Sequence, residues 1–239
     1  DHNDLQAPAE VGRLAAERTV RRLGAQKIKS AQLPVVFEAP VAASLLSHLV
    51  SAISGGSLYR KASFLLDHLG KQIFPHQVRI YEQPRMKGAA GSAAFDREGV
   101  ATHDREIVSD GILQSYVLSS YSARKLGLET TGNAGGVRNL VIEPGKHDLE
   151  ALLREMGAGV LVTELIGFGV NNVTGDYSRG AAGFWVEGGE IQYPVQEFTI
   201  AGNLKQMFAG LAEVGNDVDR RGNTRTGSIL LEQMAIAGQ

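Results

Sequence analysis

The chain has 239 residues, of which 43% are hydrophobic and 21% charged, so it has enough apolar mass for a folded core and is not mainly disordered. Lys and Arg number 24 against 26 Asp and Glu, and the resulting net charge of −2 excludes the basic excess typical of nucleic-acid-binding proteins. Cysteine is absent, which excludes disulfides, thiolate metal ligands and cysteine nucleophiles. No apolar stretch reaches the roughly 18 residues of a membrane helix, and we predict a cytoplasmic protein.

The N-terminal third is expected to be mainly helical. A helix is predicted over residues 8–23, because a proline suits its first turn and apolar residues recur at helical spacing. A strand is predicted over residues 33–37, followed by a helix over residues 41–53 whose leucines fall on one face. A further short helix is expected through residue 66, with Ser57 as its N-cap.

Beyond about residue 77, strand-like segments alternate with glycine turns, and the 29 glycines of the chain indicate many tight turns. The predicted strands are residues 78–81, 112–118, 140–142, 160–165, 182–186 and 229–234. Residues 187–190 are predicted as the turn of a β-hairpin. Helices are expected over residues 120–126, 148–156 and 204–214.

This order of elements predicts an α+β fold rich in antiparallel sheet, either barrel-like or a sandwich, with flanking helices and glycine-rich turns. A helix–strand–helix start followed by many strands argues against a doubly wound parallel sheet. Residues 1–30 are expected to form a leading helical arm, and residues 31–239 one α+β domain.

The common catalytic motifs are absent from the sequence. There is no Walker A motif and no Gly-x-Ser-x-Gly elbow, and the glycine loop that begins at Gly167 lacks the third glycine of a dinucleotide fingerprint. The histidines form no metal-binding pair at helical spacing. Asp96, His103 and Asp104 lie in a polar stretch that is expected to be a surface loop. From the residues alone, the chain is predicted to be a binding or scaffold domain.

One longer segment is more specific. Residues 174–187, TGDYSRGAAGFWVE, resemble the signature of the TldD/PmbA family, whose members are linked to peptide processing and to modulation of DNA gyrase. Further matches follow the order of the family, at residues 53–61, 120–128, 131–136, 200–204 and 214–217. The resemblance covers nearly all of the chain and is strongest to the PmbA (TldE) branch. It implies that the chain corresponds to the C-terminal part of a longer protein.

The resemblance also implies zinc metallopeptidase chemistry, but in the TldD branch. There a helix carries His-Glu-x-x-x-His, and a cysteine near the C-terminus completes the zinc site. These positions fall here on Ser47, His48 and Ala52, with the cysteine position near Thr226. Because one histidine does not hold a zinc ion, neither a metal nor a catalytic residue is expected in this chain, and zinc is expected on a TldD-type partner. The expected assembly is a heterodimer with that partner, or a homodimer in isolation.

A peptide substrate would be held in extended form, by pairing with a sheet edge or a glycine-lined groove. Tyr177, Ser178 and Arg179 are candidates to line such a groove, and Arg179 could pair with a peptide carboxylate. Asp176, Ser178 and Arg179 could instead lock a turn before a core strand. Arg60 could contact substrate or partner, or form a surface ion pair, and His48 could contact substrate or be a partly buried polar residue of the helix.

Three functions are therefore compatible with the sequence. The first is a non-catalytic, peptide-binding subunit of a zinc peptidase complex. The second is an interaction protein that acts on gyrase or on a toxin–antitoxin system without proteolysis and without direct contact to nucleic acid. The third is an independent peptidase with a relocated site, which would need a nucleophile–base pair that the sequence does not display.

Overall fold

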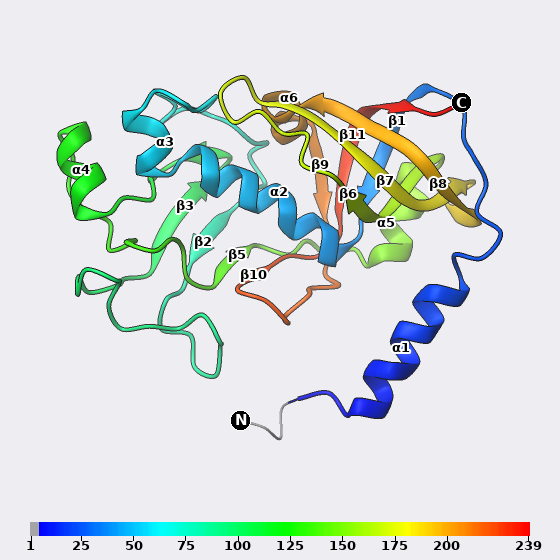
Figure 1. The fold of residues 1–239 in the computed structure, drawn as a ribbon, viewed down its shortest axis with the longest axis horizontal. Coiled ribbons are helices and arrows are strands. Elements are labelled where there is room, and N and C mark those ends of the chain that lie inside the picture. Colours follow the sequence, from blue (N-terminus) through cyan, green and yellow to red (C-terminus); the bar gives the residue numbers. More distant parts are fainter. Residues whose placement is uncertain (1–4) are drawn as a thin grey trace.

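The computed structural model describes residues 5–239 (Figure 1). Its elements in chain order are α1 (Pro8–Val20), β1 (Ala31–Phe37), α2 (Ala39–Ala52), α3 (Gly55–Tyr59), β2 (Ile80–Glu82), β3 (Arg105–Ser109), β4 (Ile112–Leu113), α4 (Ser120–Leu126), β5 (Leu140–Ile142), α5 (Leu149–Met156), β6 (Gly159–Ile166), β7 (Asp176–Glu187), β8 (Glu190–Asn203), α6 (Leu204–Ala209), β9 (Leu211–Val214), β10 (Thr224–Arg225) and β11 (Ile229–Ala237).

The larger sheet closes on itself. Strand β1 pairs with β6 on one side and with β11 on the other, so that β1, β6, β7, β8 and β11 form a ring, to which β9 is added beside β11. The pairing of β1 with β6 is parallel, and the other pairings of the ring are antiparallel. This confirms the predicted antiparallel-rich α+β fold and selects the barrel-like form over the sandwich. Closure leaves few unpaired strand edges.

A smaller sheet has the strand order β10-β5-β2-β3-β4, with β10 parallel to β5 and the remaining pairs antiparallel. In Figure 1, α2 crosses the middle of the molecule between this sheet and the barrel. The buried face of α2 comprises Ala39, Ala42, Leu45, Leu46, Leu49 and Ala52. Most of these residues join one hydrophobic core with barrel residues such as Phe37 and with Ile80 of the smaller sheet. Burial of each leucine contributes about 1.5–3 kcal/mol, so α2 is held firmly against both sheets.

Helix α1 differs from the other long helices because none of its residues is buried. It extends away from the body of the molecule in Figure 1. The turn that follows contacts the barrel through Arg21, which pairs with Glu38 at 3.2 Å and lies 4.8 Å over the ring of Phe184. The division of the chain at residue 30 stays a prediction. No helix within residues 5–239 is long and apolar enough to cross a membrane.

Local sequence signals predicted several elements correctly. Helix α4 and strand β5 have the predicted bounds, and the hairpin turn lies between β7 and β8, where Glu187 pairs with Glu190. The helix predicted over residues 204–214 is wrong in its second half. There α6 ends at Ala209, and the next residues form β9, because they pair with β11.

Other elements also differ from the prediction. Ser54, and not Ser57, is the N-cap of α3, and this helix ends at Tyr59 instead of continuing to residue 66. Helix α1 ends at Val20, and the strand predicted over residues 112–118 is reduced to β4. Strands β3 and β10 were not predicted. Asp96 is 3% exposed, although a surface loop was expected, because its carboxylate accepts hydrogen bonds from the backbone N–H groups of Glu98, Val100 and Ala134.

Candidate functional site

The site is built on α2, whose first turn is anchored to the segment before β11. The Ala39 backbone N–H donates to the hydroxyl of Ser228 at 3.0 Å, and this hydroxyl donates to the Asp217 carboxylate at 2.6 Å. Such a contact satisfies one of the backbone donors that an α-helix leaves free at its start. Together with the buried leucine face, it fixes the position of His48 in the middle of the helix.

Strand β7 presents the opposite wall of the site. Side chains alternate between the two faces of a strand, so Tyr177 and Arg179 lie on one face and Ser178 on the other. Tyr177 is buried and Ser178 is exposed, with the Ser178 N–H donating to Gly169 O at 2.6 Å. The rings of Tyr177 and His48 meet edge to face, with centroids 5.9 Å apart. The structure therefore brings His48, Tyr177 and Arg179 together.

A cavity of about 230 Å³ opens between α2 and β7. It is lined by His48 and Ser51 of α2, by Phe168, Val170 and Asn172 of the loop between β6 and β7, and by Arg179. Asn172 fixes the loop to the segment around α3, since its side-chain amide donates to Ala62 O at 2.7 Å and to the Ser57 hydroxyl at 3.2 Å. Phe168 at the tip of the loop is fully exposed.

Three polar atoms in this region lack a protein partner. The Nε2 atom of His48, the hydroxyl of Tyr177 and the Nε atom of Arg179 are buried and have no hydrogen bond of ordinary geometry with any part of the chain that the structure describes, although the Tyr177 hydroxyl and the Arg179 guanidinium lie close enough to interact. Arg179 also forms no ion pair with an acidic side chain of residues 5–239. Buried polar groups are almost always paired in folded proteins. Three unpaired atoms in one place indicate a site that a ligand or water completes.

Burial, together with the charge of Arg179, sets the electrostatics of the site. Burial, and then the nearby charge of Arg179, lower the pKa of His48. Burial raises the pKa of Tyr177 to about 12, although Arg179 acts in the opposite direction. At neutral pH the imidazole and the phenol are therefore uncharged, and the guanidinium supplies the positive charge of the site. This arrangement can bind an anion.

The positions that the family resemblance assigned to zinc lie in different surroundings. Ser47 is exposed, and its hydroxyl donates to Ala43 O at 3.1 Å. Ala52 is buried and has no side-chain donor, while the buried hydroxyl of Thr226 donates to Gly227 O at 2.7 Å. Only His48 carries an ordinary zinc ligand. These four residues therefore do not fit a zinc ion.

Three of the predicted binding residues do not line the cavity, and of these Tyr177 is buried beside His48. Ser178 faces the other side of β7. Arg60 is exposed and interacts with its neighbour Tyr59, to whose hydroxyl it donates at 3.2 Å and over whose ring it lies at 5.3 Å. The turn-locking role that was considered for this part of β7 applies to Asp176, which accepts hydrogen bonds from Thr174 at 2.6 Å and Asn203 at 3.2 Å.

The sequence did not identify Ser51, Phe168, Val170 or Asn172 as part of the site. One local signal was available, since Phe168 is a large apolar residue between two glycines and so belongs to an exposed loop tip. The proximity of this loop to α2 has no local signal, because the two segments are more than one hundred residues apart in the chain.

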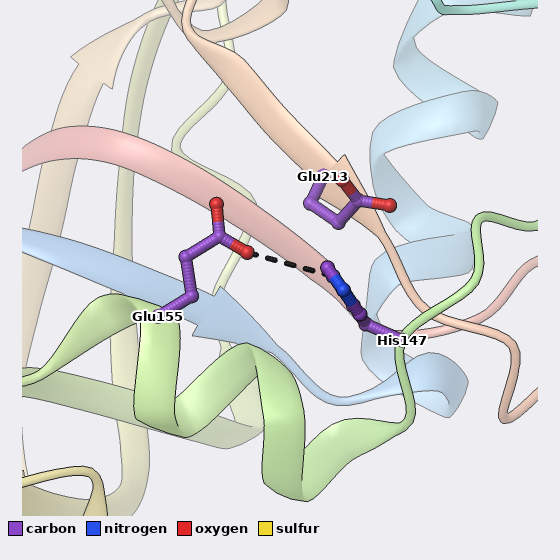
Figure 2. Close-up of side chains that lie close together, drawn as sticks. All are labelled: His147, Glu155 and Glu213. Atoms are coloured by element: carbon purple, nitrogen blue, oxygen red, sulfur yellow. Dashed lines mark ion pairs between the residues drawn. The ribbon is translucent and has the colours of Figure 1, made fainter.

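Two further features lie elsewhere. A larger cavity of about 570 Å³ beside α6 has apolar walls formed by residues such as Leu65, Phe74 and Phe208, and it contains none of the predicted site residues. Figure 2 shows a cluster of His147, Glu155 and Glu213, whose possible ligand atoms lie within 4.8 Å of one another. His147 and Glu155 are exposed and form an ion pair at 3.7 Å. Exposed pairs of this kind contribute little to stability.

Comparisons with known proteins agree with the sequence signature. The family model of the PmbA/TldA metallopeptidase C-terminal domain matches residues 30–238. The chain is 54% identical over 239 residues to the metalloprotease PmbA homolog of Haemophilus influenzae, and 55% identical over 237 residues to the metalloprotease PmbA of Escherichia coli O157:H7. These matches cover 100% and 99% of this chain but only 53% of each relative.

Solved structures show the same fold. A protein from Bacteroides thetaiotaomicron, described as a candidate modulator of DNA gyrase, is 34% identical with a TM-score of 0.94, over 99% of this chain and 54% of that protein. TldE from Thermococcus kodakarensis is 28% identical with a TM-score of 0.84, over 96% of this chain and 55% of that protein.

Proposed function

This chain belongs to the PmbA/TldD family of metallopeptidase-related proteins, and we propose that it is a non-catalytic, peptide-binding subunit of a TldD/PmbA-type zinc metallopeptidase complex. Zinc and the cleavage step are assigned to a TldD-type partner, and the peptide is held by this subunit. The chain spans 53% of the length of the relatives named above, so the activity of the whole protein is part of the proposal. A location in the cytoplasm stays a prediction.

The observation that supports this function most directly is the composition of the cavity between α2 and β7. Its walls contain one cationic side chain, Arg179, and only one ordinary zinc ligand, His48, and each of the two bears a buried nitrogen without a hydrogen-bond partner among the described residues. A metallopeptidase centre needs several ligands and a bound water that it can activate. The cavity is therefore better suited to holding a substrate than to cleaving one.

The partner assignment follows from this division of roles. A subunit that binds peptide without cleaving it needs a catalytic subunit beside it, and we propose a heterodimer with the TldD-type protein. In isolation, the surface that would bind the partner is expected to produce a homodimer. Obligate interfaces of this kind bury large areas, commonly more than about 2,000 Å², so size measurements of the full-length protein, alone and with its partner, test the assembly.

The function is tested by peptide hydrolysis with the full-length protein, with its TldD-type partner, and with the mixture. Zinc is measured by elemental analysis on each sample. We expect this protein alone to be inert and free of stoichiometric zinc, and the mixture to cleave with zinc on the partner. Stoichiometric zinc and cleavage by this protein alone would show that the proposed division of roles is wrong.

A second function is favoured by the description of the Bacteroides relative as a candidate modulator of DNA gyrase. In this case the protein acts through contacts with another protein and without proteolysis. The net charge of −2 does not favour direct contact with DNA. The two functions are separated by the hydrolysis experiment, because an interaction modulator leaves the peptide intact in the mixture as well.

A further inference from the structure

We propose that the cavity between α2 and β7 binds a peptide carboxylate, with Arg179 as the group that pairs with it. This inference rests on the proposed peptide-binding function and specifies the part of the peptide that the subunit recognises. The carboxylate can be the C-terminus of the peptide or the side chain of an Asp or Glu residue, and the experiment below distinguishes these two sources.

The first argument is the unbalanced charge of the cavity. Arg179 lines the cavity, is half-buried, and has no acidic partner within the described part of the chain. The neighbouring side chains that bear unpaired atoms, His48 and Tyr177, are neutral at physiological pH, so they do not offset the charge. A buried cation is normally paired. A bound carboxylate supplies the missing charge and can accept two parallel hydrogen bonds from a guanidinium.

The second argument is the unpaired hydrogen-bonding capacity around Arg179. The Nε2 atom of His48 and the Tyr177 hydroxyl are both buried without partners among residues 5–239. Tyr177 is 1% exposed, and its hydroxyl lies close enough to Arg179 for the guanidinium to affect its pKa. A fold that gained nothing from this hydroxyl would be more stable with a phenylalanine here. We therefore assign Tyr177 as a positioning residue, whose ring packs against His48 and whose hydroxyl lies beside the Arg179 guanidinium at the back of the cavity wall.

The third argument is size and polarity. A volume of about 230 Å³ is below the range of about 300–1,000 Å³ that is typical of sites enclosing a whole small molecule. It fits the end group or one side chain of a longer ligand. Phe168 and Val170 provide an apolar border beside Arg179, and Phe168 is fully exposed. Capture of a C-terminal carboxylate is a known mode of peptide recognition.

The test measures the binding of fluorescent peptides to the full-length protein by anisotropy. The first peptide has no acidic side chain and ends in a leucine with a free carboxylate. The second is the same peptide with a C-terminal amide, and the third is the amide with one internal glutamate. We expect amidation to weaken binding by about tenfold or more, because a hydrogen bond to a charged group is lost. Full recovery by the glutamate peptide shows that the site accepts a carboxylate from either source, and no recovery assigns it to the C-terminus.

Variants connect this preference to the cavity. In R179Q the difference between the acid and the amide should disappear, and in R179K it should shrink, since lysine keeps the charge but not the paired geometry. Arg124 is an exposed arginine at the end of α4, and the matched control R124Q should keep the full difference. Y177F retains the ring beside His48 and should reduce the preference without abolishing it.

The outcomes for this inference and for the proposed function are distinguishable. If wild-type protein binds all three peptides equally, the carboxylate site is wrong and the peptide-binding function stands. If it binds none of them, both are wrong. If R124Q loses the preference as R179Q does, the preference depends on the overall charge of the protein, and the cavity is not the site. Should R179Q fail to fold, the acid and amide peptides still decide the question on wild-type protein.

Discussion

The imidazole of His48 meets the buried ring of Tyr177 edge to face, with centroids 5.9 Å apart and planes at 78° to each other. This contact joins the middle of α2 to β7 in the wall of the barrel. It depends on packing, because the His48 Nε2 atom and the Tyr177 hydroxyl have no hydrogen-bond partner within the described residues. Its geometry is thus set by the fold.

Replacement of Tyr177 by phenylalanine should leave the free energy of unfolding unchanged or raise it by about 1 kcal/mol, because the variant removes a buried hydroxyl without a partner. Y177L should lower it by about 1 kcal/mol or more, since the aromatic pair with His48 is lost. Urea denaturation measures both. A clear loss of stability in Y177F would mean that the hydroxyl is already paired in the free protein.

The pH dependence of stability should contain a contribution from His48. Burial and the charge of Arg179 lower its pKa in the folded state, so below pH about 6.5 the unfolded chain binds more protons than the folded one. This contribution to stability is present above pH about 6.5 and is lost as the pH falls toward the folded-state pKa. The difference in unfolding free energy between wild type and H48Q should therefore decrease on acidification. A difference that is constant from pH about 8 to about 5 would contradict the shift.

Ser228 should be important for the placement of α2. In S228A the Ala39 N–H and the Asp217 carboxylate lose the hydroxyl that joins them. We expect a loss of about 1–3 kcal/mol in the free energy of unfolding, because buried polar groups are left unpaired. The matched control is S47A in the same helix, whose exposed hydroxyl only donates back to Ala43 O, and its effect should be within about 0.5 kcal/mol. Equal effects of the two variants would refute the anchoring role.

Gly183 allows β7 to approach β6 closely within the barrel. A Cβ atom at this position would lie 1.9 Å from Leu161 O, whereas one at Gly180 in the same strand would lie 3.3 Å from the Ile166 side chain. Because the ring of strands is closed, the backbone has little room to move, and G183A should cost about 1–3 kcal/mol or more. G180A should cost clearly less. Thermal denaturation of the two variants compares them directly, and similar melting temperatures would contradict this account.

Local sequence patterns were sufficient to predict the class of fold and those elements whose ends are marked by capping or turn residues. Helix α4 and the turn between β7 and β8 were predicted with the observed bounds, because capping serines and paired glycines act within a few residues. The segment 211–214 follows α6 directly, and only its pairing with β11 makes it a strand. Barrel closure also depends on pairing between distant segments, since β1 and β11 pair with each other although they lie at opposite ends of the predicted domain.

The sequence likewise predicted only part of the candidate site. The family signature and the residue types gave His48, Arg60, Tyr177, Ser178 and Arg179 as candidate binding residues, and strand alternation alone would have separated Ser178 from its neighbours. The meeting of His48 with Tyr177, the border formed by Phe168 and the exclusion of Arg60 were decided by tertiary structure. The physical reason is that local signals act over one turn or one strand pair. The cavity, in contrast, exists because the core holds α2 against a barrel whose strands come from distant parts of the chain.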